Sequence, residues 1–221
     1  MFVLASTSPR RRELITLFGL PFEFISVDVD ETPHENESPE DLVKRLSVSK
    51  SSEGARAHSG TIVVAADTVV AFDNQILGKP KDADDAVRML ELLRARAHYV
   101  YSGVTIIRGA EQRTQIARTT VWMRDYSDDE IKTFVASGEA LDKAAAYSIQ
   151  DPGFRPVARV EGCYANVMGL PLCHLYRALK SFGVSIIEPD RACQKHLDIY
   201  CPVAKQILAD EYSIENLKSK I

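Results

Sequence analysis

Residues 2–19 read FVLASTSPRRRELITLFG and combine an apolar run, a polar turn and a segment with helical periodicity. The apolar run Phe2–Ala5 predicts a strand. Ser8 suits the N-cap of a helix, and Pro9 suits its first position, where a missing N–H costs nothing. Gly19 is expected to end that helix. A strand that leads through a polar turn into a helix is typical of α/β proteins.

The rest of the chain continues this alternation. The strand at 61–66 is expected to end at Asp67, and extended structure resumes over 69–72. A turn is expected at Asp73 and Asn74. The fold class is therefore α/β, in the mixed α+β sense. Further elements are expected as follows: helices beginning near Ser38, Asp82, Ser127 and Gly169, strands at 22–27, 97–108 and 113–123, and strands around Val157 and Tyr164.

Size and charge restrict the function classes. The chain has 221 residues, 45% of them hydrophobic, which suffices for one large domain or two joined lobes. Its net charge of −4 gives no general attraction to nucleic acid or an anionic membrane, so any basic site must be local. The apolar run at the start is too short for a signal peptide or a membrane span. We therefore expect a soluble, cytoplasmic protein that binds no membrane.

The cysteines all fall in the last third of the chain, at Cys163, Cys173, Cys193 and Cys201. No Cys-x-x-Cys pair occurs, so the sequence carries only a weak signal for structural zinc. Cys193 and Cys201 lie near His196, but chance explains this better than a metal site does. We expect reduced thiols, most of them buried.

The arginines at 10–12 fall in the first turn of the predicted helix, where cations oppose the helix dipole. An anion bound by the helix-start N–H groups and by arginine would remove that conflict, and phosphate is the natural candidate. The alternative is a solvated cluster that pairs with Glu13 or other surface acids. Ser6 and Ser8 stand beside the cluster and favour the phosphate interpretation.

Two acidic residues are candidates for a metal site. Asp67 follows an apolar strand, and α/β proteins place their ligands beyond strand ends. Its carboxylate could bind a divalent cation or take a proton from water, whereas an ordinary turn that ends the strand is the alternative. Glu31 is the best partner, because its acidic loop also follows a strand. Two carboxylates together with phosphate oxygens would suit Mg²⁺ or Mn²⁺.

Three lysines and a glutamine complete the set of candidates. Lys79 lies in a stiff Gly-Lys-Pro turn that could direct its ammonium into a cleft. Lys50 and Lys143 are further candidates for phosphate contact, although a single lysine, Lys50 in particular, is more often an exposed charge. Gln150 can donate and accept hydrogen bonds together, which reading a base edge requires.

At these residues the chain resembles the Maf family of nucleotide pyrophosphatases, from Phe2 to about Gly183. The resemblance implies a two-lobed mixed α/β fold around a central cleft, often dimeric and related to the inosine-triphosphate pyrophosphatases. It also implies metal-dependent hydrolysis of a nucleoside triphosphate to the monophosphate and pyrophosphate. The matching segments are LAS-x-SPRR at 4–11, DT at 67–68, GKP at 78–80, SGE-x-x-DKA-x-AY-x-IQ at 137–150 and GLP at 169–171.

The resemblance also suggests roles for particular residues. Asp67 matches the family's proposed proton acceptor, and Arg10, Thr68 and Gln150 match the positions that separate subfamilies. Their identities resemble the branch that acts on dTTP and UTP, with modified pyrimidine nucleotides as further substrates, rather than the branch that acts on 7-methyl-GTP. The remaining matches are acidic and basic cleft positions, namely Glu31, Lys50 and Lys79.

Three residues depart from the family pattern. Ala140 replaces a usual proline, and Ala145 and Asp151 replace usual glycines. Ala145 would be strained if the backbone there needs a positive φ. Asp151 adds a negative charge beside Gln150, so the base preference stays open.

The chain is expected to divide into a catalytic domain over 1–187 and a C-terminal extension over 188–221. Ile214, Leu217 and Ile221 stand at helical spacing behind a potential cap at Ser213. An accessory helix that packs on the body or on a second subunit is therefore predicted.

Together these residues suggest a site in which the arginine turn and Asp67 meet on one triphosphate. A rival hypothesis is a nucleotide- or nucleic-acid-binding regulator of cell division and septum formation that lacks turnover. The acidic balance argues against an extended nucleic-acid footprint. The catalytic set comprises Asp67, Glu31 and Lys79, the metal ligands Glu31 and Asp67, and the substrate-binding set Ser6, Ser8, Arg10, Arg11, Lys50, Thr68, Lys143 and Gln150.

Overall fold

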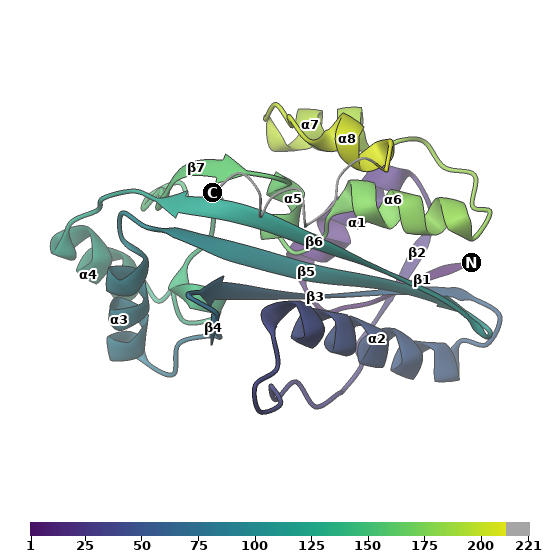
Figure 1. Cartoon of the computed structure of the whole chain (residues 1–221), viewed down its shortest axis with the longest axis horizontal. Helices are drawn as coiled ribbons and strands as arrows, with labels where there is room; N and C mark the ends of the chain where they lie inside the picture. Colours follow the sequence, from purple (N-terminus) through teal and green to yellow (C-terminus); the bar gives the residue numbers. More distant parts are fainter. Residues whose placement is uncertain (211–221) are drawn as a thin grey trace. The chain divides into compact units, whose positions relative to one another are not determined.

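The computed structural model describes residues 1–210 of the chain (Figure 1). Its strands are β1 (Phe2–Ala5), β2 (Phe22–Ile25), β3 (Ile62–Phe72), β4 (Gln75–Leu77), β5 (Ala97–Arg108), β6 (Glu111–Met123) and β7 (Val157–Glu161). Its helices are α1 (Pro9–Ile15), α2 (Pro39–Ala57), α3 (Ala83–Leu93), α4 (Asp128–Ala136), α5 (Tyr164–Val167), α6 (Leu172–Ser181), α7 (Asp190–Leu197) and α8 (Ala204–Leu208), with short 3₁₀ turns η1 (Thr16–Phe18) and η2 (Ala144–Ala146).

The strands form one mixed sheet in the order β2-β1-β3-β5-β6-β7, with β4 paired to β3. β1 runs parallel to β2 and β3, which is the pairing expected when helices connect the strands. β4 and β7 run antiparallel to their neighbours β3 and β6. This arrangement confirms the mixed α/β class that the sequence predicts.

The chain divides into two compact units. The first comprises Met1–Thr68, Tyr101–Arg118 and the described residues from Gly162 onward. The second comprises Val69–Val100 and Thr119–Glu161. The long strands β3, β5 and β6 contribute residues to each unit, and each unit is described below by itself.

In the first unit, α2 packs closely on the sheet. A side chain at Gly103 in β5 would place its Cβ 2.3 Å from the carbonyl oxygen of Val43, so only glycine fits there. Val3 and Val63 of the neighbouring strands are fully buried. In Figure 1, α2 lies on one side of these strands, and α1 and α6 lie on the other. The close packing brings the side chains of α2 to β3.

The opening strand, turn and helix form as the sequence predicts. The Oγ of Ser8 accepts a hydrogen bond from the N–H of Arg11 at 3.4 Å, which caps α1. Pro9 stands at the first helical position. Gly19 ends the following 3₁₀ turn with a φ of 66°, in the left-handed region that favours glycine.

Two strand predictions are wrong. Asp67 does not end a strand but lies in the middle of β3, which continues to Phe72. The tertiary structure allows this because Lys50 lies next to the buried carboxylate. Tyr164 begins the short helix α5 instead of a strand, since packing overrides the β propensity of a single aromatic residue. The turn at Asp73 and Asn74 is confirmed, and it leads into β4.

In the second unit, an aromatic cluster holds α3 and α4 to the following loop. The rings of Phe134 and Phe154 stack with centroids 4.5 Å apart, and Tyr126 donates a hydrogen bond of 2.7 Å to the carbonyl of Leu90. Ser127 and Glu130 form the predicted capping box at the start of α4.

His98 in this unit predicts a dependence of stability on pH. Its Nε2 shares a hydrogen bond of 2.7 Å with the hydroxyl of Tyr147, and burial lowers the pKa of His98 from 6.5 to about 4. The unfolded chain therefore binds more protons below pH 6.5, so this stability is complete above pH 6.5 and is lost as the pH falls towards 4. Between pH 7 and pH 5, we expect urea unfolding to show a loss of about 2 kcal/mol more in the wild type than in His98→Gln.

His174 provides an internal reference for that measurement. Burial, aided by Arg177, lowers its pKa to about 4 as well, but this residue titrates in both proteins and cancels in the comparison. Equal losses in the wild type and in His98→Gln would show that His98 does not cause the acid sensitivity.

The C-terminal extension contains α7 and α8, so its described part is helical. Ile214, Leu217 and Ile221 lie outside the described residues, and so does their predicted cap Ser213. All four cysteines line one small cavity of about 10 Å³, and Cys163, Cys173 and Cys193 are buried, as expected. His196 does not join them, because its Nε2 lies 2.9 Å from Oε1 of Glu13. Within residues 1–210, no helix has the length and apolarity that a membrane crossing requires.

Candidate active site

A lysine and two carboxylates form the centre of the site, within the first unit. The Nζ of Lys50 lies 2.6 Å from Oδ1 of Asp67 and 2.7 Å from Oε1 of Glu31. Lys50 comes from α2, Asp67 from the middle of β3, and Glu31 from the loop between β2 and α2. The structure thus brings together three residues that the sequence predicts for one site.

Burial differs sharply across this group. Asp67 is 6% exposed and Lys50 is 9% exposed, whereas the side chain of Glu31 is 63% exposed. An ionised side chain in a protein interior is costly unless a partner of opposite charge lies next to it. The contact with Lys50 therefore explains why a carboxylate is tolerated inside a buried strand. Glu31 provides the face of the group that solvent and ligands can reach.

Arg11 ties the opening turn to both flanks of Asp67. Its Nη1 donates to the carbonyl of Ala66 at 2.7 Å, its Nη2 to the hydroxyl of Thr68 at 3.1 Å, and its Nε to the carbonyl of Gly169 at 2.9 Å. Three of the five N–H donors of the guanidinium are therefore used within the protein. Arg11 positions the site through these bonds, and its predicted contact with phosphate stays a prediction.

The charges of this group act on Arg11. Burial lowers the pKa of its guanidinium, while the nearby carboxylates of Asp67 and Glu31 raise it. Arg10, the residue before Arg11, also lowers the pKa of Arg11 by like-charge repulsion. Arg11 thus brings the arginine turn next to Asp67, and a shared contact with one triphosphate stays a prediction.

Thr68 belongs to a chain of hydrogen bonds inside the first unit. Its hydroxyl accepts from Arg11 and shares a bond of 2.7 Å with Ser102 of β5, and Ser102 donates to the carbonyl of Asn166 at 3.3 Å. Neither Ser102 nor Asn166 stands out in the sequence, because a hydroxyl within a strand has no local signature of its contacts. This network holds β3, β5 and α5 together next to Asp67.

The two serines of the opening turn shape its backbone. The N–H of Ser8 donates to the hydroxyl of Ser6 at 3.2 Å, and the carbonyl of Ser6 accepts from Nε of Arg12 at 3.1 Å. The guanidinium of Arg12 also lies over the ring of Phe24, 5.2 Å from its centroid. Arg12 is thus accounted for by local contacts, and Arg10 is the arginine of the turn that we retain for phosphate.

The remaining predicted residues belong to the second unit. The Nζ of Lys143 donates to Asp142 at 2.7 Å and to the side chain of Glu139 at 3.1 Å. Burial alone would lower the pKa of Lys143, but these two bonds outweigh it and raise the pKa. Lys79 and Gln150 are exposed. Their approach to the Lys50 group stays a prediction.

A left-handed turn links two of these segments. Ala145 and Ala146 have φ values of 55° and 62°, so the backbone here adopts the conformation in which the family's usual glycine is unstrained. The N–H of Ala145 donates to the carbonyl of Gly78 at 2.9 Å. This bond places the turn after Lys143 directly against the turn that carries Lys79.

Ala145→Gly should therefore raise the free energy of unfolding by up to about 1 kcal/mol. The left-handed conformation costs a residue with a side chain about 1–2 kcal/mol, and the greater freedom of glycine in the unfolded chain offsets part of this gain. Urea denaturation measures the change. Ala136→Gly, in the last turn of α4, is the control and should lose up to about 1 kcal/mol. If Ala145→Gly also lowers the free energy of unfolding, the backbone at Ala145 is not strained.

The donor set of the centre suits a hard divalent cation. Glu31 and Asp67 supply carboxylate oxygens that converge on one point, now occupied by the ammonium of Lys50. In the described part of the chain, no group of three or more His, Cys, Asp or Glu side chains could hold a metal ion. Mg²⁺ is commonly bound by one or two carboxylates together with substrate phosphates, so two protein ligands fit that class of site.

Comparisons with known proteins place the chain in a family. The model of the Maf-like protein family matches residues 1–182. The chain is 45% identical over 188 residues to the dTTP/UTP pyrophosphatase of Dictyoglomus turgidum, a match that covers 84% of this chain and 97% of the relative. It is 42% identical over 205 residues to the dTTP/UTP pyrophosphatase of Thermomicrobium roseum, which covers 91% and 93% of the two chains.

A relative from Bacillus cytotoxicus, also named dTTP/UTP pyrophosphatase, is 44% identical over 82% of this chain and 95% of its own. Among solved structures, the Staphylococcus aureus Ham1 protein matches with a TM-score of 0.45 and 15% identity, over 71% of this chain and 79% of that one. The family model covers most of the sequence, including every residue of the Lys50 group. The chain belongs to the Maf family.

Proposed function

We propose that the chain is a nucleoside triphosphate pyrophosphatase whose substrates are dTTP, UTP and related modified pyrimidine nucleotides. It hydrolyses the bond between the α- and β-phosphates and releases the monophosphate and pyrophosphate. The observation that carries this proposal is the Lys50 bridge between Glu31 and Asp67, in a chain whose relatives are dTTP/UTP pyrophosphatases.

Glu31 and Asp67 would hold a divalent cation, Mg²⁺ or Mn²⁺, together with oxygens of the triphosphate. Such an ion polarises a phosphoryl oxygen and neutralises developing charge. Two carboxylates next to each other repel, so a cation between them is favourable, and Lys50 supplies that charge in the free protein. The metal dependence of the activity is therefore a direct test of this donor set.

Each of the site residues has a separate role in hydrolysis. Water attacks the α-phosphorus, the bond from that phosphorus to the bridging oxygen breaks, and pyrophosphate leaves with the electron pair. Asp67 accepts the proton of the attacking water through the carboxylate oxygen that Lys50 does not bind. Arg10, Lys50 and Lys79 stabilise the charge on the departing pyrophosphate.

Base recognition is assigned to the second unit and to Thr68. Gln150 is exposed and offers both a donor and an acceptor to the edge of a pyrimidine. Lys143 contacts the nucleotide from a segment that is bonded to the turn of Lys79. Asp151 accepts hydrogen bonds from the N–H groups of Gly153 and Phe154, so its charge helps to shape the loop beside Gln150.

The family resemblance further supports a cytoplasmic homodimer. Size-exclusion chromatography with light scattering should give twice the mass of one chain, and a monomeric mass at micromolar concentration would count against the dimer.

A phosphate-release assay tests the function. Folded protein is incubated with a panel of nucleoside triphosphates and Mg²⁺ or Mn²⁺, with and without added inorganic pyrophosphatase, and malachite green detects orthophosphate. We expect orthophosphate only when pyrophosphatase is present, with dTTP and UTP ahead of 7-methyl-GTP, and none in EDTA. Failure to release phosphate from any nucleotide would favour the rival regulator that binds nucleotides without turnover.

A further inference from the structure

The exposed position of Glu31 raises the question of what holds it opposite Asp67. Glu31 lies in the loop of residues 26–38, in which no residue belongs to a helix or strand. Its contact with Lys50 is one ion pair, in which the side chain of Glu31 itself is 63% exposed. Exposed ion pairs contribute about 0–1 kcal/mol, which is too little to order a loop of this length.

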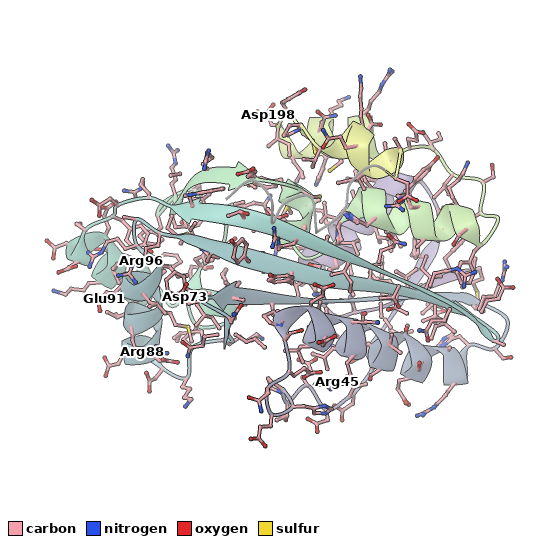
Figure 2. The ribbon with its side chains drawn as sticks, in the orientation of Figure 1. Arg45, Asp73, Arg88, Glu91, Arg96 and Asp198 are labelled. Atoms are coloured by element: carbon pink, nitrogen blue, oxygen red, sulfur yellow. The ribbon has the colours of Figure 1, made fainter. Side chains whose placement is uncertain are left out.

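A second side chain of α2, Arg45, binds the same loop at two points. Its Nε and Nη2 form a paired contact with the carboxylate of Glu37, at 2.7 and 2.8 Å. The Nη2 also donates to the carbonyl of Thr32 at 3.0 Å. Thr32 follows Glu31 directly, so the backbone next to the candidate ligand is anchored to the helix that carries Lys50. Arg45 is labelled beside α2 in Figure 2.

The loop completes this anchor with its own hydrogen bonds. The Oε2 of Glu37 accepts from the N–H of His34 at 3.0 Å, and Oδ1 of Asp30 accepts from the N–H of Thr32 at 2.9 Å. The side chain of Glu37 is only 8% exposed, and the hydrogen bonds from Arg45 lower its pKa to about 2. The pair therefore stays ionised at any pH at which the enzyme would be assayed.

We propose that Arg45, held by Glu37, is a positioning residue that keeps Glu31 opposite Asp67 and so sets the affinity of the site for its divalent cation. Neither Arg45 nor Glu37 has to touch the nucleotide for this role. The identity of the cation rests on the proposed function, whereas the ordering of the loop does not.

A competing explanation is that Arg45 acts only through its positive charge. The carboxylates of Asp30 and Asp67 both lie close enough to raise the pKa of Arg45. The positive charge of Arg45 therefore also acts on the carboxylate of Asp67. Arg45→Lys separates the two explanations. Lysine keeps the charge, but a single ammonium cannot bind both oxygens of Glu37 and the carbonyl of Thr32 in the same geometry.

The test compares Arg45→Lys, Arg45→Gln and Glu37→Gln with the wild type. The matched control is Arg56→Gln, which removes an exposed arginine–glutamate pair from the same helix. Mn²⁺ affinity is measured by titration calorimetry in the presence of a dUTP analogue with an α,β-imido bridge, and by the Mn²⁺ concentration that gives half-maximal activity. We expect Mn²⁺ to bind about 10–100-fold more weakly in the three loop variants. Arg56→Gln should stay within twofold.

Two further readouts separate positioning from general damage. At saturating Mn²⁺, kcat of the loop variants should stay within threefold of the wild type, because the catalytic groups are intact. In the Glu31→Gln background, Arg45→Lys should weaken Mn²⁺ binding no further, since its effect passes through Glu31. A full additional loss in the double variant would show that Arg45 acts by another route.

Hydrogen exchange of the free protein tests the loop without any cation. Amides within 26–38 should exchange faster in Arg45→Lys and Glu37→Gln than in the wild type, while amides of α3 stay unchanged. Wild-type Mn²⁺ affinity together with wild-type loop protection in Arg45→Lys would overturn the proposal and leave charge as the role of Arg45. A different outcome is that the loop variants lose protection while the wild type turns over no nucleotide. That outcome would refute the proposed function but retain the role of Arg45 in ordering the loop.

Discussion

Asp67→Asn is expected to lower kcat for dTTP and UTP by about 10²–10⁴-fold. Asparagine has nearly the same shape, so it preserves the packing of β3, but its amide cannot accept a proton from water. The change also removes the negative charge of one of the two carboxylates that would hold the cation. Steady-state kinetics at saturating Mn²⁺ measures the loss, and activity within threefold of the wild type would remove Asp67 from its assigned role.

The fold of Asp67→Asn has to be checked separately, because Lys50 loses one of its two ionic partners. Glu31 still lies 2.7 Å from the Nζ of Lys50, so the ammonium keeps one ionised neighbour. Circular dichroism and urea denaturation should show a native protein. Since a buried cation with fewer partners is less stable, some reduction in the free energy of unfolding is expected.

Arg11→Lys is expected to reduce the free energy of unfolding by about 3 kcal/mol. One ammonium cannot reach the carbonyls of Ala66 and Gly169 and the hydroxyl of Thr68 together, and each buried acceptor left without a donor costs about 1–3 kcal/mol. Urea denaturation measures this loss, and kcat should fall as well because both neighbours of Asp67 lose their anchor.

Arg12→Lys is the matched control for that variant. Arg12 stands next in the same helix turn but makes one hydrogen bond, to the carbonyl of Ser6, and one contact with an aromatic ring. A lysine can reproduce much of this, so we expect a loss below about 1 kcal/mol. If the two variants lose similar amounts of unfolding free energy, the three hydrogen bonds of Arg11 do not stabilise the fold as proposed.

Elements whose signals lie within a few residues are predicted well from the sequence. The cap at Ser8, the stop at Gly19 and the capping box of Ser127 with Glu130 all appear in the structure. Each depends on hydrogen bonds between residues no more than four positions apart, so the local pattern contains the whole interaction.

The roles within the site were harder to predict, because their partners are distant in sequence. Arg11 resembles a phosphate ligand when only its position at a helix start is considered. Its actual acceptors include Gly169, 158 residues away. Glu37 and Arg45 carry no motif either, and only the folded loop shows that they anchor the segment of Glu31.

The mixed α/β class and the local caps and turns follow from the sequence alone, and so do the residue types proposed for a phosphate and metal site. The position of Asp67 inside a buried strand, rather than beyond its end, depends on packing between distant segments. The physical reason is that a carboxylate in a strand interior is tolerated only when a cation lies beside it. Lys50 reaches that place from α2, 17 residues away, by packing that no local pattern encodes.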